Sequence, residues 1–106
     1  MKSDDQEVHP KSRAWPSDPE MLRLLFQGKW RLPVLRELQS GPCRLSQLKR
    51  DIPQCTKKML IDTLRALEAL GWVVRHDYSN RIKWVEYSIE ESGAEQIRRL
   101  IAELVH

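Results

Sequence analysis

A stripe of leucines in the middle of the chain constrains the fold more than any other feature of the sequence. Between residues 56 and 71 leucines recur at spacings of four, three and three, at Leu60, Leu64, Leu67 and Leu70. This spacing places their side chains on one face of an α-helix. Thr56 offers a side-chain oxygen as N-cap, and Gly71 favours the left-handed backbone that ends many helices. The segment is therefore predicted to form a helix with one buried and one exposed face.

After Gly71 the sequence changes to a pattern typical of β-strands. The segments 72–76 and 83–89 are rich in aromatic and β-branched side chains, and residues 77–81 lie between them. Val85, Tyr87 and Ile89 alternate with their neighbours, as the two faces of a strand require. The two segments are predicted to form a β-hairpin.

Two helices are predicted before residue 40. The first begins after Ser17, which can cap it, and Gly28 stops it. The second covers about residues 30–39 and contains Pro33. Because proline lacks an amide hydrogen, Pro33 is compatible with this helix only in its first turn.

Two more helices complete the pattern. A short one has Ser46 as its expected N-cap and ends at Pro53, and the last begins near Glu90. The last three helices before the hairpin, together with the hairpin, describe a mainly α fold with a small β-hairpin, the winged helix-turn-helix. In that fold the longer helix fits the roughly 12 Å major groove of DNA, and the hairpin reaches an adjacent groove or the phosphates.

The length of the chain bounds its organisation. Its 106 residues fit one small domain. Residues 1–17 are polar and show no sustained period, so we predict a flexible arm followed by one domain over residues 18–106. No apolar run approaches the ~20 residues of a membrane span, and no secretory signal is recognisable. We therefore expect a cytoplasmic protein with no membrane partner.

Positive charge is concentrated in the middle of the chain. Residues 44–83 hold nine Lys and Arg against four Asp and Glu, whereas residues 84–106 hold two against five. This asymmetry predicts a surface for a polyanion, here double-stranded DNA. Two alternatives stay open. The exposed residues of the helix after Thr56 are ordinary solvated positions, and the charges of the hairpin protect the edge of its sheet from pairing with another chain.

The candidate DNA-binding residues lie on three predicted elements. Lys and Arg can meet phosphates or guanine edges, a carboxylate can accept from a cytosine amine, and hydroxyls and helix N-termini bind phosphates. The leucine-striped helix presents Thr56, Lys57, Lys58, Asp62 and Arg65. The hairpin presents Arg75, His76, Asn80, Arg81 and Lys83. The short helix presents Arg44, Ser46 and Lys49.

Several short motifs follow one another along residues 18–104. They include Gly28-Lys29-Trp30, Leu45-Ser46-Gln47-Leu48, Lys58-Met59-Leu60, Thr63-Leu64-Arg65 and Val85-Glu86-Tyr87-Ser88. In this order they resemble the HxlR-type regulators, which are bacterial winged-helix transcription factors related to the MarR group. The resemblance implies a homodimer, joined through its first and last helices, that binds a two-fold related operator.

Two apolar stripes agree with the implied homodimer, because together they contain more apolar side chains than one small core needs to bury. Their members are Leu22, Leu25, Phe26, Ile97, Leu100, Ile101 and Leu104. The alternative is that each stripe packs inside its own monomer.

Cys55 and Cys43 are the candidate redox residues. Cys55 can pack on Leu60 as a small buried hydrophobe. Alternatively, the positive end of the following helix and its two adjacent lysines lower the pKa of this thiol and make it oxidisable. Many HxlR-type regulators carry a redox-sensing cysteine just before the first helix, and Ser17 stands in that place here, which weakens the sensing hypothesis.

The sequence thus predicts a DNA-binding transcriptional regulator and not an enzyme. No residue supplies a recognisable catalytic base with an orienting acid, and the cysteines and histidines lack the spacing of a metal site, so no metal or other cofactor is expected. Two alternatives remain: a winged-helix module that binds a protein partner, and a thiol-based redox-sensing form of the regulator. Trp30 is expected in the core. If several of Trp15, Trp72 and Trp84 line one groove, they could hold an aromatic small-molecule effector.

Overall fold

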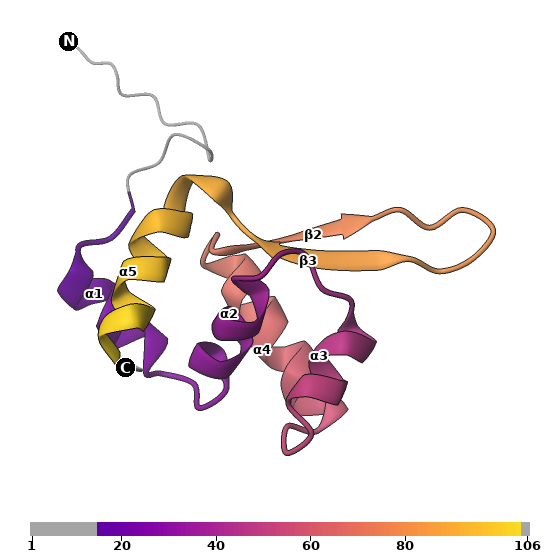
Figure 1. The fold of residues 1–106 in the computed structure, drawn as a ribbon, viewed down its shortest axis with the longest axis horizontal. Helices are drawn as coiled ribbons and strands as arrows, with labels where there is room; N and C mark the ends of the chain where they lie inside the picture. The colour runs from indigo at the N-terminus through magenta and orange to yellow at the C-terminus, as the bar shows by residue number, and fades with distance from the viewer. Residues whose placement is uncertain (1–14, 105–106) are drawn as a thin grey trace, which may run out of the picture.

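The computed structural model describes residues 15–104, which form a helical body with a projecting hairpin (Figure 1). The helices are α1 (Asp18–Leu25), α2 (Arg31–Leu38), α3 (Leu45–Asp51), α4 (Lys57–Ala69) and α5 (Ala94–Leu104). Between α4 and α5 lie β2 (Val73–Asp77), β3 (Val85–Ile89) and the single 3₁₀ turn η2 (Glu91–Gly93). This order confirms the predicted mainly α fold with a small β-hairpin.

The helices form two groups, one around α4 and the other made of α1 and α5. The group around α4 lies beside the hairpin. Helix α4 packs against α2, α3 and β2, while α1 packs against α5. Figure 1 shows the α1–α5 pair at one end of the body, α3 at the other, and the hairpin extending away from the helices. The hairpin and the α3–α4 unit therefore lie at the same end of the molecule.

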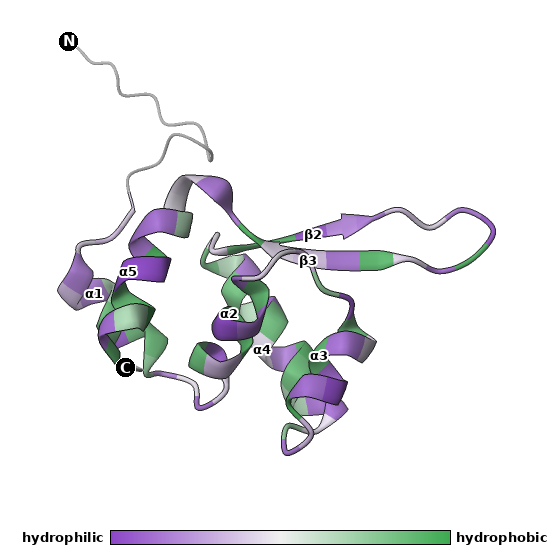
Figure 2. Cartoon of the chain, viewed as in Figure 1, coloured by the Kyte–Doolittle hydropathy of each residue, from purple (hydrophilic) through white to green (hydrophobic). Residues whose placement is uncertain are grey.

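The core forms where the apolar faces of the helices meet (Figure 2). Leu60, Leu64 and Leu67 of α4 are buried, as the leucine stripe predicts, while Leu70 is only partly buried at the end of the helix. Trp72 follows α4 directly and is 2% exposed. The transition from helix to hairpin is thus anchored in the core.

The predicted helix signals are confirmed at four positions. Ser17 Oγ accepts a hydrogen bond from the amide of Glu20, and Thr56 Oγ1 accepts one from the amide of Met59 at 3.1 Å. Gly71 has φ 82°, the left-handed value that favours glycine. Pro33 lies in the first turn of α2, where an amide hydrogen has no partner within the helix.

Two predicted helix starts are wrong by a few residues. Helix α3 begins at Leu45 with Arg44 as N-cap, because Gln47 Oε1 accepts the Arg44 amide at 2.7 Å, so Ser46 already lies inside the helix. The last helix begins at Ala94 rather than near Glu90. A carboxylate oxygen of Glu90 accepts the Ser92 amide at 2.9 Å and holds the intervening residues in the 3₁₀ turn.

A backbone bridge that the sequence analysis missed ties the start of α3 to the hairpin. The Cys43 amide donates to the Tyr87 carbonyl at 2.9 Å, and the Tyr87 amide donates to the Cys43 carbonyl at 2.8 Å. The strands β2 and β3 pair antiparallel, with Val73 opposite Ile89 and Asp77 opposite Val85. The residue before Arg44 is therefore hydrogen-bonded to the outer edge of β3.

Residues 15–17, which precede the predicted boundary at residue 18, contact the rest of the described structure. Trp15 Nε1 donates to Ser92 Oγ at 2.9 Å, and its ring centroid lies 6.4 Å from that of Trp72. Trp15 also covers Gly93 so closely that a Cβ added there would lie 2.3 Å from the indole ring. Residues 15–17 hence belong with the domain, while residues 1–14 of the predicted arm lie outside the described residues.

None of the helices in residues 15–104 combines the length and apolar character needed to cross a membrane.

Candidate nucleic-acid interface

A groove of about 700 Å³ runs between α4, the start of α3 and the hairpin. Its lining contains five cationic side chains and one carboxylate. The cations are Arg44, Lys57, Arg65, Arg75 and Lys83, and the carboxylate is Glu68. The fold thus brings together basic residues that lie up to 39 positions apart in the sequence, from 44 to 83.

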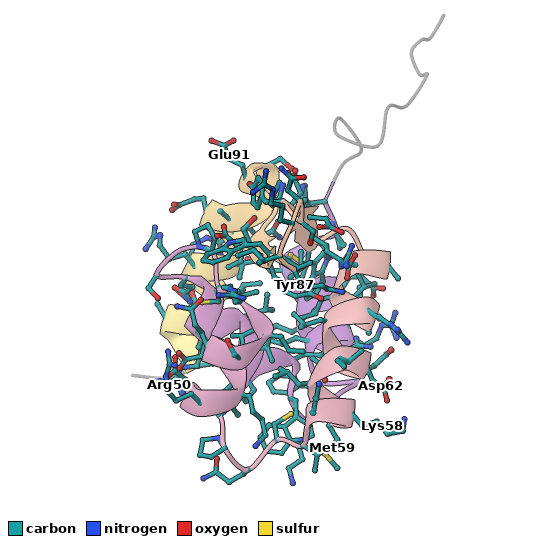
Figure 3. The ribbon with its side chains drawn as sticks, turned by 90° about the vertical axis from the view of Figure 1, so that its right-hand side faces the viewer. Arg50, Lys58, Met59, Asp62, Tyr87 and Glu91 are labelled. Atoms are coloured by element: carbon teal, nitrogen blue, oxygen red, sulfur yellow. The ribbon has the colours of Figure 1, made fainter. Side chains whose placement is uncertain are left out.

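The leucine stripe determines which residues α4 turns outward. Because Leu60, Leu64 and Leu67 face the core, the charged residues of the helix occupy its exposed side. They surround a shallow hollow formed by Lys57, Lys58, Ile61, Asp62 and Arg65. Figure 3 shows Lys58, Met59 and Asp62 on the outer side of α4, away from Arg50 of α3.

Lys58 and Asp62 form an ion pair on this surface, with Nζ 3.0 Å from Oδ2. Their side chains are 84% and 56% exposed, so the pair is well solvated and contributes little to stability. An incoming phosphate or base can therefore replace Lys58 or Asp62 in this pair at little cost in free energy.

The hairpin divides the candidate residues into two sets. Arg75 and Lys83 line the groove, whereas His76, Asn80 and Arg81 are exposed and do not line it. The His76 and Tyr78 rings stack with their centroids 6.0 Å apart. These residues thus form a separate polar and aromatic surface outside the groove.

Asp77 stabilises the turn of the hairpin. Hydrogen bonds from Ser79 hold the pKa of the Asp77 carboxyl below its usual value, and the charges of Arg75 and Lys83 act in the same direction. Asp77 Oδ1 accepts the Ser79 amide at 2.9 Å. The carboxylate is therefore ionised at neutral pH and fixes the chain where β2 ends and the turn of the hairpin begins.

The residues predicted at α3 do not all reach the groove. Arg44 and Ser46 line it, but Lys49 Nζ donates to the Pro53 carbonyl at 3.0 Å. That hydrogen bond directs the Lys49 ammonium toward the loop after α3. A contact of Arg44 that sequence reasoning missed is the aromatic ring of Trp84, whose centroid lies 3.9 Å from the guanidinium carbon.

Known proteins share this architecture and much of the sequence. A model of the HxlR-like helix-turn-helix family matches residues 25–106. The chain belongs to the HxlR-like helix-turn-helix family. YkvN of Bacillus subtilis strain 168, an HTH-type transcriptional regulator, is 47% identical over 85 residues, which are 80% of this chain and 71% of YkvN. An HTH-type transcriptional regulator of Methanothermobacter thermautotrophicus is 42% identical over 66 residues, which are 62% of this chain and half of that relative.

Solved structures of HTH-type regulators superpose on this HxlR-like chain. The crystal structure of the transcriptional regulator YtcD has a TM-score of 0.72 at 36% identity and covers 84% of this chain and 90% of its own. The redox regulator HypR in its reduced form has a TM-score of 0.73 at 31% identity, with 83% and 86% of the two chains covered. These matches confirm both the predicted fold and the predicted resemblance to HxlR-type regulators.

Neither thiol of this HxlR-like chain has the lowered pKa on which the redox hypothesis depends. Cys55 is buried, and burial raises its pKa against a weaker opposing effect of Lys49. Burial also raises the pKa of the half-buried Cys43, assisted by the negative charges of Glu37, Asp51 and Glu86. For Cys55, loss of hydration thus acts against the lowering that the redox hypothesis requires.

Four of the seven predicted dimer residues are enclosed within a single chain. Leu25, Ile97, Leu100 and Ile101 are each at most 4% exposed and belong to one core cluster, where α1 packs against α5. The alternative that the stripes pack inside the monomer is therefore correct for these four. Phe26 remains 63% exposed, Leu104 38% exposed and Leu22 partly exposed.

The tryptophans do not gather in one groove. Trp15 and Trp72 lie together, but Trp84 lies against Arg44, and Lys29 Nζ lies 5.2 Å from the centroid of Trp30. The condition of the effector hypothesis, that several of Trp15, Trp72 and Trp84 line one groove, is therefore not met by Trp84 within one chain. Residues 15–104 also contain no group of three or more His, Cys, Asp or Glu side chains that could hold a metal ion.

Proposed function

We propose that this HxlR-like protein is a sequence-specific DNA-binding transcriptional regulator that binds a two-fold related operator as a homodimer. The observation that carries this proposal is the groove in which cations from α3, α4 and the hairpin converge. Helix α4 enters the major groove, and the hairpin lies on an adjacent groove or on the phosphates.

The residues of α4 take different roles in this arrangement. Lys57 and Lys58 stand in the first turn of the helix and meet phosphates or guanine edges. Arg65 lies two turns further on and follows the phosphate backbone. Asp62 accepts from a cytosine amine once its ion pair with Lys58 opens.

The candidate residues outside α4 add contacts to DNA from α3 and from the hairpin. Ser46 offers a hydroxyl from the first turn of α3, and Arg75 and Lys83 offer cations from the hairpin. Arg81, His76 and Asn80 extend the same contact along the hairpin. Most of these groups recognise phosphate, so they contribute affinity and orientation rather than sequence preference.

A homodimer would place two α4 helices on successive half-sites of one operator. The exposed Phe26 and Leu104, together with the partly exposed Leu22, are the proposed contacts of each copy. They lie on α1 and α5 or directly after α1, away from the α4 groove, so DNA and the second copy do not compete for the same surface.

Selection of bound duplexes from a random-sequence pool tests this function. Replacing Arg65 by Ala should weaken binding to the selected duplex by about 1–3 kcal/mol if the guanidinium reaches a base edge, and less if it contacts only phosphate. Replacing Lys57 by Ala should weaken binding to selected and unselected duplexes alike. Both are measured by fluorescence anisotropy with labelled duplex.

Arg23→Ala is the matched control, because Arg23 is an exposed cation of α1, paired with Glu20, that does not line the groove. This variant should bind like the wild type. Enrichment of no sequence from the pool, together with unchanged affinity of the Arg65 and Lys57 variants, would contradict the proposal.

A further inference from the structure

The guanidinium of Arg44 stacks on the ring of Trp84, which comes from the hairpin. The guanidinium carbon lies 3.9 Å from the ring centroid, well inside the ~6 Å range of a cation–π contact. Arg44 is half-buried, and Trp84 is 37% exposed. The contact therefore joins the start of the helix-turn-helix to the hairpin at the edge of the groove.

Trp84 is itself fixed by hydrogen bonds within the hairpin. Its indole Nε1 donates to Glu86 Oε2 at 2.8 Å, and its amide donates to Ser79 Oγ at 2.9 Å. Its carbonyl accepts the Tyr78 amide at 2.7 Å. The ring thus has a defined orientation before any ligand binds.

The backbone of Arg44 is held equally firmly. Its amide donates to Gln47, and the preceding Cys43 is bridged to Tyr87 by two backbone hydrogen bonds. Within residues 15–104 no carboxylate forms an ion pair with Arg44. The described part of the chain therefore supplies no carboxylate that neutralises its positive charge.

We propose that Trp84 is a positioning residue for DNA binding, which holds the Arg44 guanidinium so that its N–H groups meet one DNA phosphate. The inference rests on the proposed function. Stacking uses the flat face of the guanidinium and leaves the donors in its plane for an anion. Arg44 also lines the groove beside Lys57 and Arg65, where the phosphates of a bound duplex would pass.

The salt dependence of binding separates this role from a merely structural one. Each neutralised phosphate contributes about 0.9 to the slope of log K against log salt. Arg44→Ala should reduce the slope by about 0.9, the contribution of one phosphate contact. Trp84→Leu removes no charge, yet it should reduce the slope by a similar amount because Arg44 is no longer held. Trp84→Phe restores an aromatic face and should recover most of the wild-type slope.

The double variant Arg44→Ala/Trp84→Leu completes a thermodynamic cycle. If Trp84 acts through Arg44, the double variant should lose no more affinity and no more slope than Arg44→Ala alone. The probe is a labelled duplex selected from a random pool by the wild-type protein, titrated by anisotropy at several salt concentrations. Lys29→Ala is the matched control, since Lys29 also lies over a tryptophan ring but does not line the groove; its slope should equal the wild-type slope.

Additive losses in the double variant, or a Trp84→Leu variant with weakened binding and an unchanged slope, would overturn the inference. So would an Arg44→Ala variant with the wild-type slope, although the proposed function would stand if Arg65→Ala still weakened binding. Thermal unfolding of each variant shows whether it is folded, and the Trp84→Phe variant keeps the test decisive if Trp84→Leu unfolds. Absence of any duplex binding by the wild type would instead refute the proposed function.

Discussion

At the scale of single residues, burial decides the chemistry of the two cysteines. A thiol reacts as its thiolate, and moving the thiolate out of water costs free energy, so burial raises the pKa. For Cys43 the nearby carboxylates of Glu37 and Asp51 add to this effect. For Cys55, enclosed at 0% exposure, loss of hydration dominates.

This leads to a prediction for thiol reactivity. Because the pKa of both thiols is raised, the thiolate fraction at pH 7 is smaller than in an unfolded peptide, and it increases only as the pH rises toward and above the ordinary value of 9.0. Alkylation by iodoacetamide at pH 7 should therefore be slower than for glutathione, and slower at Cys55 than at Cys43. In guanidinium chloride the two cysteines should react alike. A fast-reacting Cys55 in the folded protein would contradict the assigned burial.

At the scale of elements, an N-cap sets where α4 begins. Thr56 Oγ1 accepts the Met59 amide at 3.1 Å, and the backbone of Thr56 is extended just before α4 starts. This bond places Lys57 and Lys58 in the first helical turn. The start of α4 is thus determined by one side-chain oxygen.

Removing that oxygen should destabilise the domain without disturbing its core. Thr56→Ala is expected to lower the free energy of unfolding by about 1 kcal/mol, the usual contribution of an N-cap hydrogen bond. Thr56→Ser keeps the oxygen and should retain most of the stability. Urea unfolding followed by circular dichroism measures both. Equal stability of the alanine variant and the wild type would show that the cap contributes nothing.

At the scale of the whole molecule, most of the apolar surface of α1 and α5 is used within one chain. Leu25 contacts the same core as Ile97 and Leu100, which leaves Phe26 as the most exposed apolar residue of α1. An exposed phenylalanine loses contact with water only if another surface covers it. The proposed second copy supplies that surface.

Phe26→Glu should therefore weaken the homodimer while leaving the monomer folded. Sedimentation equilibrium is expected to show a shift from dimer toward monomer, because a carboxylate placed in the contact has no partner. Tyr78→Glu is the matched control, since Tyr78 is a similarly exposed aromatic, at 60%, but lies on the hairpin. A wild-type protein that sediments as a monomer, or a Phe26→Glu variant that remains fully dimeric, would refute this interface.

Local signals in the sequence were sufficient for the elements and for most of the candidate site. The leucine spacing gives α4 its buried face, Thr56 and Gly71 mark its ends, and the same spacing leaves Lys57 and Arg65 outward. These features depend on residues a few positions apart, where backbone geometry fixes which side chains share a face. The predicted start of α3 is wrong because serine is by itself a better N-cap residue than arginine. The hydrogen bond that makes Arg44 the N-cap comes from the side chain of Gln47, which lies inside the helix.

Local features of the sequence were enough to predict the helix period, the N-caps of α1 and α4, the hairpin and the charge of the exposed surface, because each depends on neighbouring residues. The packing of the elements sets which cations converge on one groove, that Trp84 lies against Arg44, and that α1 and α5 cover each other's leucines and isoleucines. These contacts join residues far apart in the sequence, up to 39 positions in the groove and 40 between Arg44 and Trp84. Their geometry depends on how the elements pack, and no local spacing encodes it.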